Sequence, residues 1–346
     1  MTTRGSRFHR SVSSLTPMLA ESKDDAFRTQ LEPYRRQITL HAYRMLGSLQ
    51  DAEEVAQESL VRGWEHLDQL RSGAAAKAWL YKIATNACLD RLKARRRRAL
   101  PPAVAAAADP AQPPGAPAHE RLWIEPAPDA WLEVPADPQQ RPDARAMRHE
   151  SIALAFITAL QLLPPKQRAA LLLVDVLGLR PRETADLLET TEVSVNSLLQ
   201  RARKNLETRA VEPRPPTGPD ETALLHRLID TWERGDLDAL TGLLARDAVF
   251  SMPPHAEWYA GRAAIRQFFE RFFVADPKRF RLMPVGANGS PAVGVYAAPI
   301  EGGTFEPVAI TLFTIRDGLV AEITKFTMPQ LFPLFGLPDR LPDASS

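Results

Sequence analysis

The sequence predicts a multidomain protein in which two all-α blocks precede an α+β domain with a curved, cone-shaped antiparallel sheet. Three observations predict this fold class. Two proline-rich breaks divide the 346 residues into three blocks, each large enough for a core of its own. Apolar residues recur at helical spacing in the first two blocks. The third block mixes helical segments with strand-like ones.

The breaks set the predicted domain boundaries. Proline and alanine dominate residues 99–143, and a second proline-rich stretch covers residues 211–219. Because proline lacks an amide donor, neither stretch holds a helix or a central strand, and both are interpreted as linkers. The predicted folded blocks are residues 24–98, 144–210 and 220–338. Residues 1–23 are expected to be a disordered tail, and residues 339–346 a second tail.

Charge is distributed unevenly along the chain. Of the 42 acidic and 43 basic residues, 16 and 12 lie from Asp220 onward, which leaves 26 and 31 in front of it. The capacity to bind an anionic partner therefore lies in the first two blocks.

Composition also limits the compartment and the covalent chemistry. No apolar run approaches the roughly 18 residues that a membrane helix needs, and the first residues lack an apolar signal segment. A cytoplasmic protein without a membrane partner is expected. The single cysteine, Cys88, excludes an internal disulfide and a cysteine-rich zinc site. Because Cys88 falls in an apolar helical pattern, it is predicted to be a buried thiol.

The second helix of the first block has an apolar stripe and an acidic side. Its apolar residues recur at helical spacing and predict a buried stripe of Ala52, Val55, Ala56, Leu60, Trp64 and Leu67. Asp51, Glu54 and Glu58 then fall together on the outer side. Such carboxylates either complement the positive end of the helix dipole or form a docking face for a basic partner.

The third helix, predicted over residues 76–98, combines apolar, amide and basic residues. Lys82, Thr85, Asn86 and Lys93 are expected on its exposed side. The densest basic run of the chain ends this helix, with Arg91, Lys93, Arg95, Arg96, Arg97 and Arg98. Such a surface suits phosphates and the unstacked bases of opened DNA, although a basic run is also typical of a solvated helix end.

The second block has the spacing of a helix-turn-helix. An apolar helix over 169–177 stops at Gly178, and a short helix over 182–188 precedes a break and a final helix over 193–208. Val195, Leu199, Ala202 and Leu206 are predicted to point inward. The outer side keeps amide, hydroxyl and guanidinium groups, which a plain three-helix bundle has no reason to carry. This pattern favours DNA recognition.

The third block alternates between helix and strand signals. Helices are predicted over 221–234, 237–244 and 262–273, and strands over 248–252, 279–285, 292–297, 306–316 and 319–326. Asp317-Gly318 between the last two strands is a strong hairpin signal. Helices packed on one curved antiparallel sheet are implied.

The first two blocks resemble the extracytoplasmic-function class of the sigma-70 superfamily along almost their whole length. Residues 43–48 (YRMLGS) with 51–58 (DAEEVAQE) resemble the segment that grips the β′ subunit of RNA polymerase. Residues 78–90 (AWLYKIATNACLD) resemble the helix that captures and melts the minus-ten promoter box. Residues 163–168 (LPPKQR) and 194–203 (SVNSLLQRAR) resemble the domain that reads the minus-thirty-five box.

The resemblance implies roles for individual residues. Core polymerase binding is implied for Asp51, Glu53, Glu54, Gln57 and Glu58. Minus-ten contacts are implied for Lys82, Asn86, Arg91, Lys93, Arg95, Arg96 and Arg97. Minus-thirty-five contacts are implied for Arg182, Ser194, Asn196, Ser197, Gln200, Arg201, Arg203 and Lys204. The implied partners are core RNA polymerase, through its β′ and β subunits, and promoter DNA. A separate anti-sigma protein is compatible with the sequence but not required by it.

The third block resembles the SnoaL-like, nuclear-transport-factor-two-like cone. The resemblance rests on Met252-Pro253-Pro254, Trp258-Tyr259-Ala260-Gly261 and Phe335-Gly336-Leu337-Pro338. Residues 123–129 of the first linker (WIEPAPD) are similar to a tryptophan-proline motif of sigma factors that carry this fusion, with Ile124 and Ala127 departing from it. The resemblance implies a sigma factor modulated in cis by its C-terminal domain.

An enzyme and a transcription factor without polymerase are the two alternative classes of function. SnoaL-like cones include isomerases and cyclases, and His255, Trp258 and Tyr259 could line such a pocket. No paired-histidine metal motif, phosphate-binding glycine loop or nucleophile elbow occurs, so no catalytic residue, metal or cofactor is expected. A transcription factor that works without polymerase would leave the first block unexplained.

Overall fold

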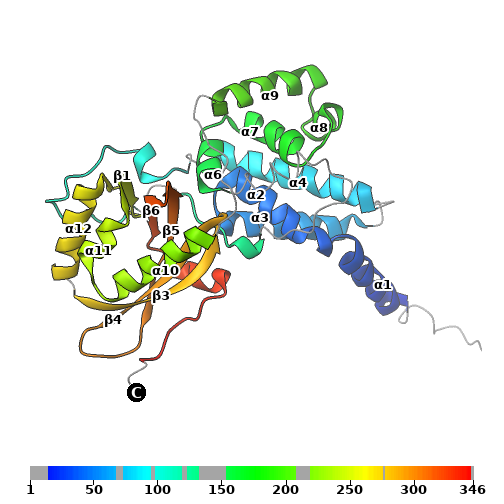
Figure 1. The fold of residues 1–346 in the computed structure, drawn as a ribbon. Coiled ribbons are helices and arrows are strands. Elements are labelled where there is room, and N and C mark those ends of the chain that lie inside the picture. The colour runs from blue at the N-terminus through cyan, green and yellow to red at the C-terminus, as the bar shows by residue number, and fades with distance from the viewer. Residues whose placement is uncertain are drawn as a thin grey trace, which may run out of the picture.

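A computed structural model describes residues 15–67, 73–94, 98–118, 123–131, 153–207, 219–275 and 277–343. Two groups of helices lie together on one side of the molecule, and a sheet covered by helices lies beside them (Figure 1). The linker between the two helical groups passes along the sheet domain.

The first helical group contains α1 (Leu15–Gln30), η1 (Glu32–Tyr34), α2 (Arg35–Leu46), α3 (Leu49–Glu65) and α4 (Gly73–Ala94). Gly47, with φ +69°, ends α2, and the Ser48 hydroxyl accepts the Asp51 amide 3.2 Å away to cap α3. Residues 15–23, expected to be disordered, are helical. Pro17 lies in the first turn of α1, where a helix needs no amide donor.

The second helical group contains α6 (Leu154–Gln161), α7 (Pro165–Leu171), a π-helical turn η5 (Leu172–Val176), α8 (Pro181–Leu187) and α9 (Glu192–Glu207). Val195, Leu199 and Ala202 of α9 are buried, which confirms the predicted inward stripe. Glu189, with φ +51°, makes the turn between α8 and α9. These elements form the predicted helix-turn-helix.

The C-terminal domain contains α10 (Pro219–Glu233), α11 (Leu237–Gly242), β1 (Leu244–Ser251), β2 (Trp258–Ala260), α12 (Arg262–Ala275), β3 (Lys278–Ala287), β4 (Ser290–Pro299), β5 (Glu306–Arg316), β6 (Leu319–Phe326) and η6 (Pro329–Phe335). The strand order is β2-β1-β6-β5-β4-β3. The sheet is mixed rather than wholly antiparallel, because β6 returns beside β1 in the same direction. The short strand β2 was not predicted.

The two faces of the sheet have different coverings. Phe250, Phe313 and Ile323 belong to the core under the domain's helices, where they pack with Phe268 and Phe269 of α12. Figure 1 shows α10, α11 and α12 on that side. The other face contributes Tyr296, Ile310 and Phe326 to a different core, which η6 joins through Leu331 and Phe332.

The predicted motif Phe335-Gly336-Leu337-Pro338 packs against the sheet through Leu337. A Cβ atom at Gly294 of β4 would lie 2.4 Å from the Leu337 side chain, so a larger residue at this position would push that side chain away from the strand. Tyr296 donates a hydrogen bond to the Pro338 carbonyl at 2.7 Å. The segment from Phe335 to Pro338 therefore seals the second face of the sheet.

The described part of the first predicted linker is bonded to the sheet domain. Residues 105–118 follow the edge strand β2 and the turn before it: the Ala108 amide donates to the Trp258 carbonyl at 2.8 Å, and the Gly115 amide donates to the Glu257 carboxylate at 2.9 Å. Proline removes amide donors but leaves every carbonyl as an acceptor. The sheet domain supplies donors to them, including Arg271, which bonds the Pro110 carbonyl at 3.0 Å.

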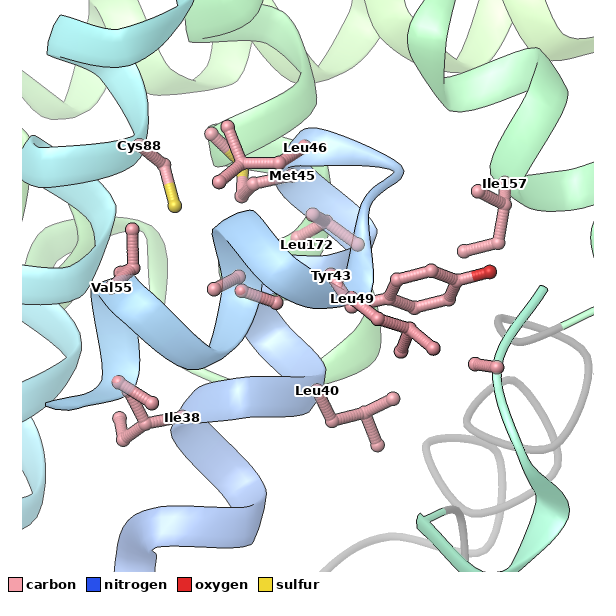
Figure 2. Packing of buried hydrophobic residues seen from close by; sticks show 14 of the residues in the cluster. Ile38, Leu40, Tyr43, Met45, Leu46, Leu49, Val55, Cys88, Ile157 and Leu172 are labelled. Atoms are coloured by element: carbon pink, nitrogen blue, oxygen red, sulfur yellow. The ribbon is translucent and has the colours of Figure 1, made fainter. Parts of the chain in front are cut away.

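The two helical groups share a core. Met45 and Leu46 from the end of α2 belong to the same cluster as Ile157 and Leu172 from the second group (Figure 2). Cys88 of α4 is fully buried in this cluster, as predicted, and burial raises the pKa of its thiol. The apolar contacts therefore join the groups into one unit.

Candidate functional site

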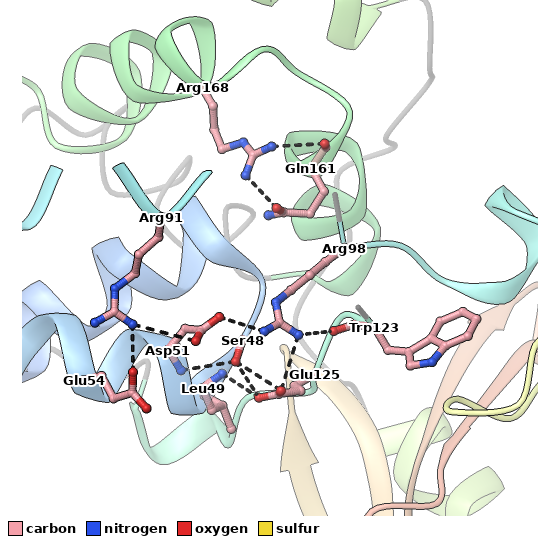
Figure 3. Close-up of polar contacts among 10 residues, drawn as sticks. All are labelled: Ser48, Leu49, Asp51, Glu54, Arg91, Arg98, Trp123, Glu125, Gln161 and Arg168. Atoms are coloured by element: carbon pink, nitrogen blue, oxygen red, sulfur yellow. Dashed lines mark hydrogen bonds and ion pairs between the residues drawn. The ribbon is translucent and has the colours of Figure 1, made fainter. Parts of the chain in front are cut away.

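The acidic side of α3 is only partly what its spacing predicted. Glu53, Glu54 and Gln57 are exposed and Glu58 is half-buried, but Asp51 is 7% exposed. The Asp51 carboxylate lies 2.7 Å from the Arg98 guanidinium (Figure 3). Asp51 differs from the outer position expected for it because the start of the linker passes over the first turn of α3.

Arg91 of α4 pairs with the acidic set. Its guanidinium lies 2.8 Å from Glu54, 3.6 Å from Glu58 and 3.8 Å from Asp51. A predicted minus-ten residue thus neutralises carboxylates that were predicted to bind polymerase. Helical periodicity could not reveal this pairing, because it depends on how α3 and α4 pack.

The remaining minus-ten residues have mixed environments. Lys82 forms an ion pair with Glu189 of the helix-turn-helix at 2.9 Å, and Lys93 pairs with Asp90 at 2.8 Å. Asn86 is half-buried. Thr85, expected to be exposed, is fully buried and lies 2.9 Å from the His41 ring. The predicted contacts Arg95, Arg96 and Arg97 lie outside the described residues.

The recognition helix α9 presents most of its predicted contacts to solvent. The exposed set is Asn196, Ser197, Gln200, Arg201, Arg203 and Lys204 with Arg182 of α8, while Ser194 is half-buried. Asn196, Gln200 and Lys204 line a groove of about 740 Å³. Arg203 also lines the groove, but its guanidinium bonds Asp175 of η5 at 2.6 Å, so this exposed side chain is tied to η5.

Glu125 of the linker connects the first helical group to the rest of the molecule. Its carboxylate accepts hydrogen bonds from the Ser48 hydroxyl at 3.0 Å and the Leu49 amide at 2.8 Å (Figure 3). A carboxylate in this position complements the positive N-terminal end of α3. The Tyr43 hydroxyl donates to the Glu125 carbonyl at 2.8 Å.

The tip of the β3–β4 hairpin meets the linker at the same place. Asn288, 1% exposed and with φ +52°, accepts the Ala127 amide at 2.8 Å and donates to the Tyr43 hydroxyl at 3.0 Å. Its backbone amide donates to the Ala127 carbonyl at 2.9 Å. We call Tyr43, Glu125, Ala127 and Asn288 the docking hub. Sequence reasoning missed the hub, although Asn288-Gly289 between two strand signals is itself a hairpin signal.

Arg168 of α7 ties the second helical group to the first. Its side chain is 1% exposed and donates to the Met45 carbonyl at the end of α2. It also bonds the Gln161 side chain at 2.6 Å and the Gln161 and Leu163 carbonyls at 3.0 and 3.2 Å. The guanidinium thus satisfies carbonyls at the ends of α2 and α6, which have no partners within their own helices.

The predicted pocket residues face the linker. The Trp258 ring nitrogen donates to the Ala105 carbonyl at 2.9 Å, and the His255 ring lies 3.0 Å from the Gly115 carbonyl. Tyr259 is fully buried, and burial raises the pKa of its hydroxyl. The linker therefore covers two of the three residues that were expected to line an open pocket.

The cone interior holds a charged residue that the sequence analysis missed. Lys325 of β6 is 5% exposed, and its ammonium lies 5.1 Å from the centre of the Phe272 ring. Burial, together with the charge of Lys278, lowers the pKa of Lys325 to about 8. The strand alternation that places Ile323 inside the cone also places Lys325 there.

The part of the chain that the structure describes holds neither a metal-binding cluster nor a membrane-spanning helix. Among the described residues, no cluster of three or more histidine, cysteine, aspartate or glutamate side chains could hold a metal ion. No helix in the same part of the chain is both long and apolar enough to cross a bilayer.

Comparison with known families assigns each folded block. Residues 31–98 match Sigma-70 region 2, residues 153–206 match Sigma-70, region 4, and residues 225–323 match the SnoaL-like domain. These matches follow the order of the two helical groups and the cone. Together with the fold, these matches define a sigma factor of the sigma-70 superfamily with an appended SnoaL-like cone.

Comparison with individual proteins makes the assignment narrower. The chain is 40% identical over 329 residues to the ECF RNA polymerase sigma factor SigG of Mycobacterium tuberculosis. The aligned residues cover 93% of this chain and 86% of SigG. It is 26% identical to SigJ of the same organism, over 90% of this chain and 95% of SigJ. The crystal structure of SigJ shares the fold, with a TM-score of 0.56 over 92% of this chain and all of SigJ, at 23% identity. The chain belongs to the ECF RNA polymerase sigma factors.

Proposed function

We propose that this sigma factor contacts the β′ subunit of core polymerase through Glu53, Glu54, Gln57 and Glu58. The minus-ten box is read by α4 and the minus-thirty-five box by α9, with phosphate contacts that position the protein and base contacts that specify the sequence. We further propose that the free chain is held in a closed state that reads only one box at a time.

One observation carries the closed state: the helix-turn-helix rests on the minus-ten helix. Elements α7 and α8 contact α4, and Lys82 of α4 pairs with Glu189 beside α8 at 2.9 Å. Figure 1 has α7, α8 and α9 over α4. A residue proposed for the minus-ten box is thus engaged by the domain proposed for the other box.

The distance along promoter DNA conflicts with this arrangement. Boxes centred near minus ten and minus thirty-five lie roughly 25 base pairs apart, which is about 85 Å at about 3.4 Å per base pair. A helical block of this size is on the order of 25 Å across. Two blocks in direct contact cannot place their reading surfaces that far apart. Opening must therefore accompany promoter binding.

The C-terminal domain favours the closed state through the docking hub. Asn288 bonds both the linker and Tyr43 of the first helical group. Because the linker connects the two helical groups, fixing it limits how far they separate. A domain that binds one conformation more tightly shifts the population toward it, so cis modulation is predicted to restrain transcription.

The proposal is tested by distance and by transcription. Donor and acceptor dyes are attached at Asp90→Cys of α4 and Glu207→Cys of α9, both exposed and outside the proposed promoter contacts, in a Cys88→Ser background. Energy transfer is measured in the free chain and in the complex with core polymerase and promoter. The distance should increase by tens of ångströms on promoter binding. An unchanged distance would contradict the closed state. Absence of run-off transcripts with core polymerase would contradict the sigma assignment.

A further inference from the structure

The recognition helix begins with an exposed apolar residue that the functions above do not use. Val193, in the first turn of α9, is 76% exposed. It does not belong to the residues that form or adjoin the cores of the described chain. Valine is a poor helix former, so neither core packing nor helix propensity explains why a valine stands at this position.

Helical spacing places Val193 on the DNA-reading side of α9. Asn196 and Ser197 follow it by three and four residues, and Gln200 follows by seven. Residues at these intervals share one face of a helix, and all three are exposed. The opposite face carries the buried Val195 and Leu199.

Local hydrogen bonds fix the direction of this first turn. The Thr191 hydroxyl oxygen accepts the Ser194 amide at 3.2 Å and lies 2.9 Å from the Ser194 hydroxyl. This is the bond that an N-cap residue makes with the third residue of a helix. The start of α9 is therefore defined, and α9 lies at the outer edge of the molecule (Figure 1).

We propose that Val193 selects a thymine in the minus-thirty-five box by contacting its C5-methyl group. The N-terminal residues of a recognition helix contact base edges in the major groove. Thymine is the base that presents a methyl group there, and apolar side chains contact it. Valine offers no hydrogen bond, so an adenine, guanine or cytosine edge gains nothing from it. This specificity role rests on the proposed function of α9.

The test replaces thymine by uracil, which removes only the methyl group. Promoter duplexes are selected from a random pool by core polymerase loaded with the full chain, and each thymine of the minus-thirty-five box is then exchanged in turn. For the native chain, one exchange should weaken binding about fourfold, the value expected for burying one methyl group. For Val193→Ala, the same exchange should have a clearly smaller effect, because alanine lacks the two γ methyl groups that reach the thymine methyl.

A matched control separates this effect from general loss of an exposed valine. Val274 is 82% exposed near the end of α12, and Val274→Ala should respond to uracil as the native chain does. Equal sensitivity of the native chain and Val193→Ala at every thymine would overturn the proposal, as would a selected box without thymine. Reduced transcription of Val193→Ala with no dependence on the methyl group would assign the valine to polymerase instead. Failure of the loaded polymerase to select any sequence would refute the proposed function rather than the role of Val193.

Discussion

Replacing Asn288 by glycine should release the C-terminal domain from the helical groups. Asn288 has φ +52°, a conformation that glycine adopts without strain, so the substitution removes the side chain and leaves the turn intact. The variant loses the acceptor for the Ala127 amide and the donor to the Tyr43 hydroxyl. Its effect therefore reports the side-chain part of the docking hub.

The expected magnitude follows from the groups left without partners. The Ala127 amide belongs to a fully buried residue, and a buried donor without an acceptor costs about 1–3 kcal/mol. The Tyr43 hydroxyl still donates to the Glu125 carbonyl, so losing the hydrogen bond from Asn288 costs less free energy at Tyr43 than at Ala127. A net change of about 2 kcal/mol corresponds to about a 30-fold shift from docked to undocked chains.

The measurement is run-off transcription with limiting sigma factor on its own promoter. Asn288→Gly should raise the transcript yield severalfold, because the open state becomes more populated. Asp317→Gly is the matched control: Asp317 has φ +53° at the same position of the exposed β5–β6 turn and lies away from the docking hub. Equal yields from the native chain and both variants would refute the restraint assigned to the hub.

Three further changes test separate features. Reversing Glu54 and Glu58 to Lys should abolish co-purification with core polymerase while helix content stays unchanged, whereas Glu65→Lys at the other end of α3 should retain it. Burial, reinforced by the charge of Arg44, holds the pKa of His41 near 3 instead of 6.5, so the unfolded chain takes up the proton first as the pH falls below 6.5. The free energy of unfolding should then decrease by up to about 1.4 kcal/mol per pH unit, and a pH-independent difference between the native chain and His41→Asn in denaturant titrations would exclude this. Burial lowers the pKa of Lys325 from 10.5 to about 8, so the cone should gain stability as the pH rises from 8 to 10.5. Lys325→Met should remove that gain and raise the melting temperature at pH 7; a lower melting temperature would mean that the ammonium stabilises the cone.

Local sequence patterns predicted most helices and strands, although not β2 or the start of α1. Contacts between distant segments could not be predicted in this way. The inward stripe of α9 follows from helical periodicity alone, and the β5–β6 hairpin follows from Asp317-Gly318. The burial of Asp51 depends on Arg98, 47 residues away in sequence, and no local pattern contains that information.

The linker and the docking hub illustrate the same limit. The prolines of the linker do not prevent two short 3-10 helices, η3 (Pro101–Ala103) and η4 (Asp129–Trp131). Composition also did not reveal that a distant domain donates hydrogen bonds to the carbonyl groups of the linker. Asn288 contacts Tyr43, which lies 245 residues away in the sequence. The pair Asn288-Gly289 indicates a hairpin turn, but no local pattern indicates the contact with Tyr43.

The chemistry of Arg168 has a consequence for how ionic strength acts on this protein. The hydrogen bonds that its guanidinium makes to Met45, Gln161 and Leu163 all go to neutral oxygens, and the side chain is buried. Dissolved ions screen exposed charges strongly and such buried contacts weakly. Binding to promoter phosphates, in contrast, weakens steeply as salt rises, because bound counterions are released. Increasing salt should therefore release promoter DNA from the open form, while the buried contacts that join the two helical groups in the closed form keep their strength.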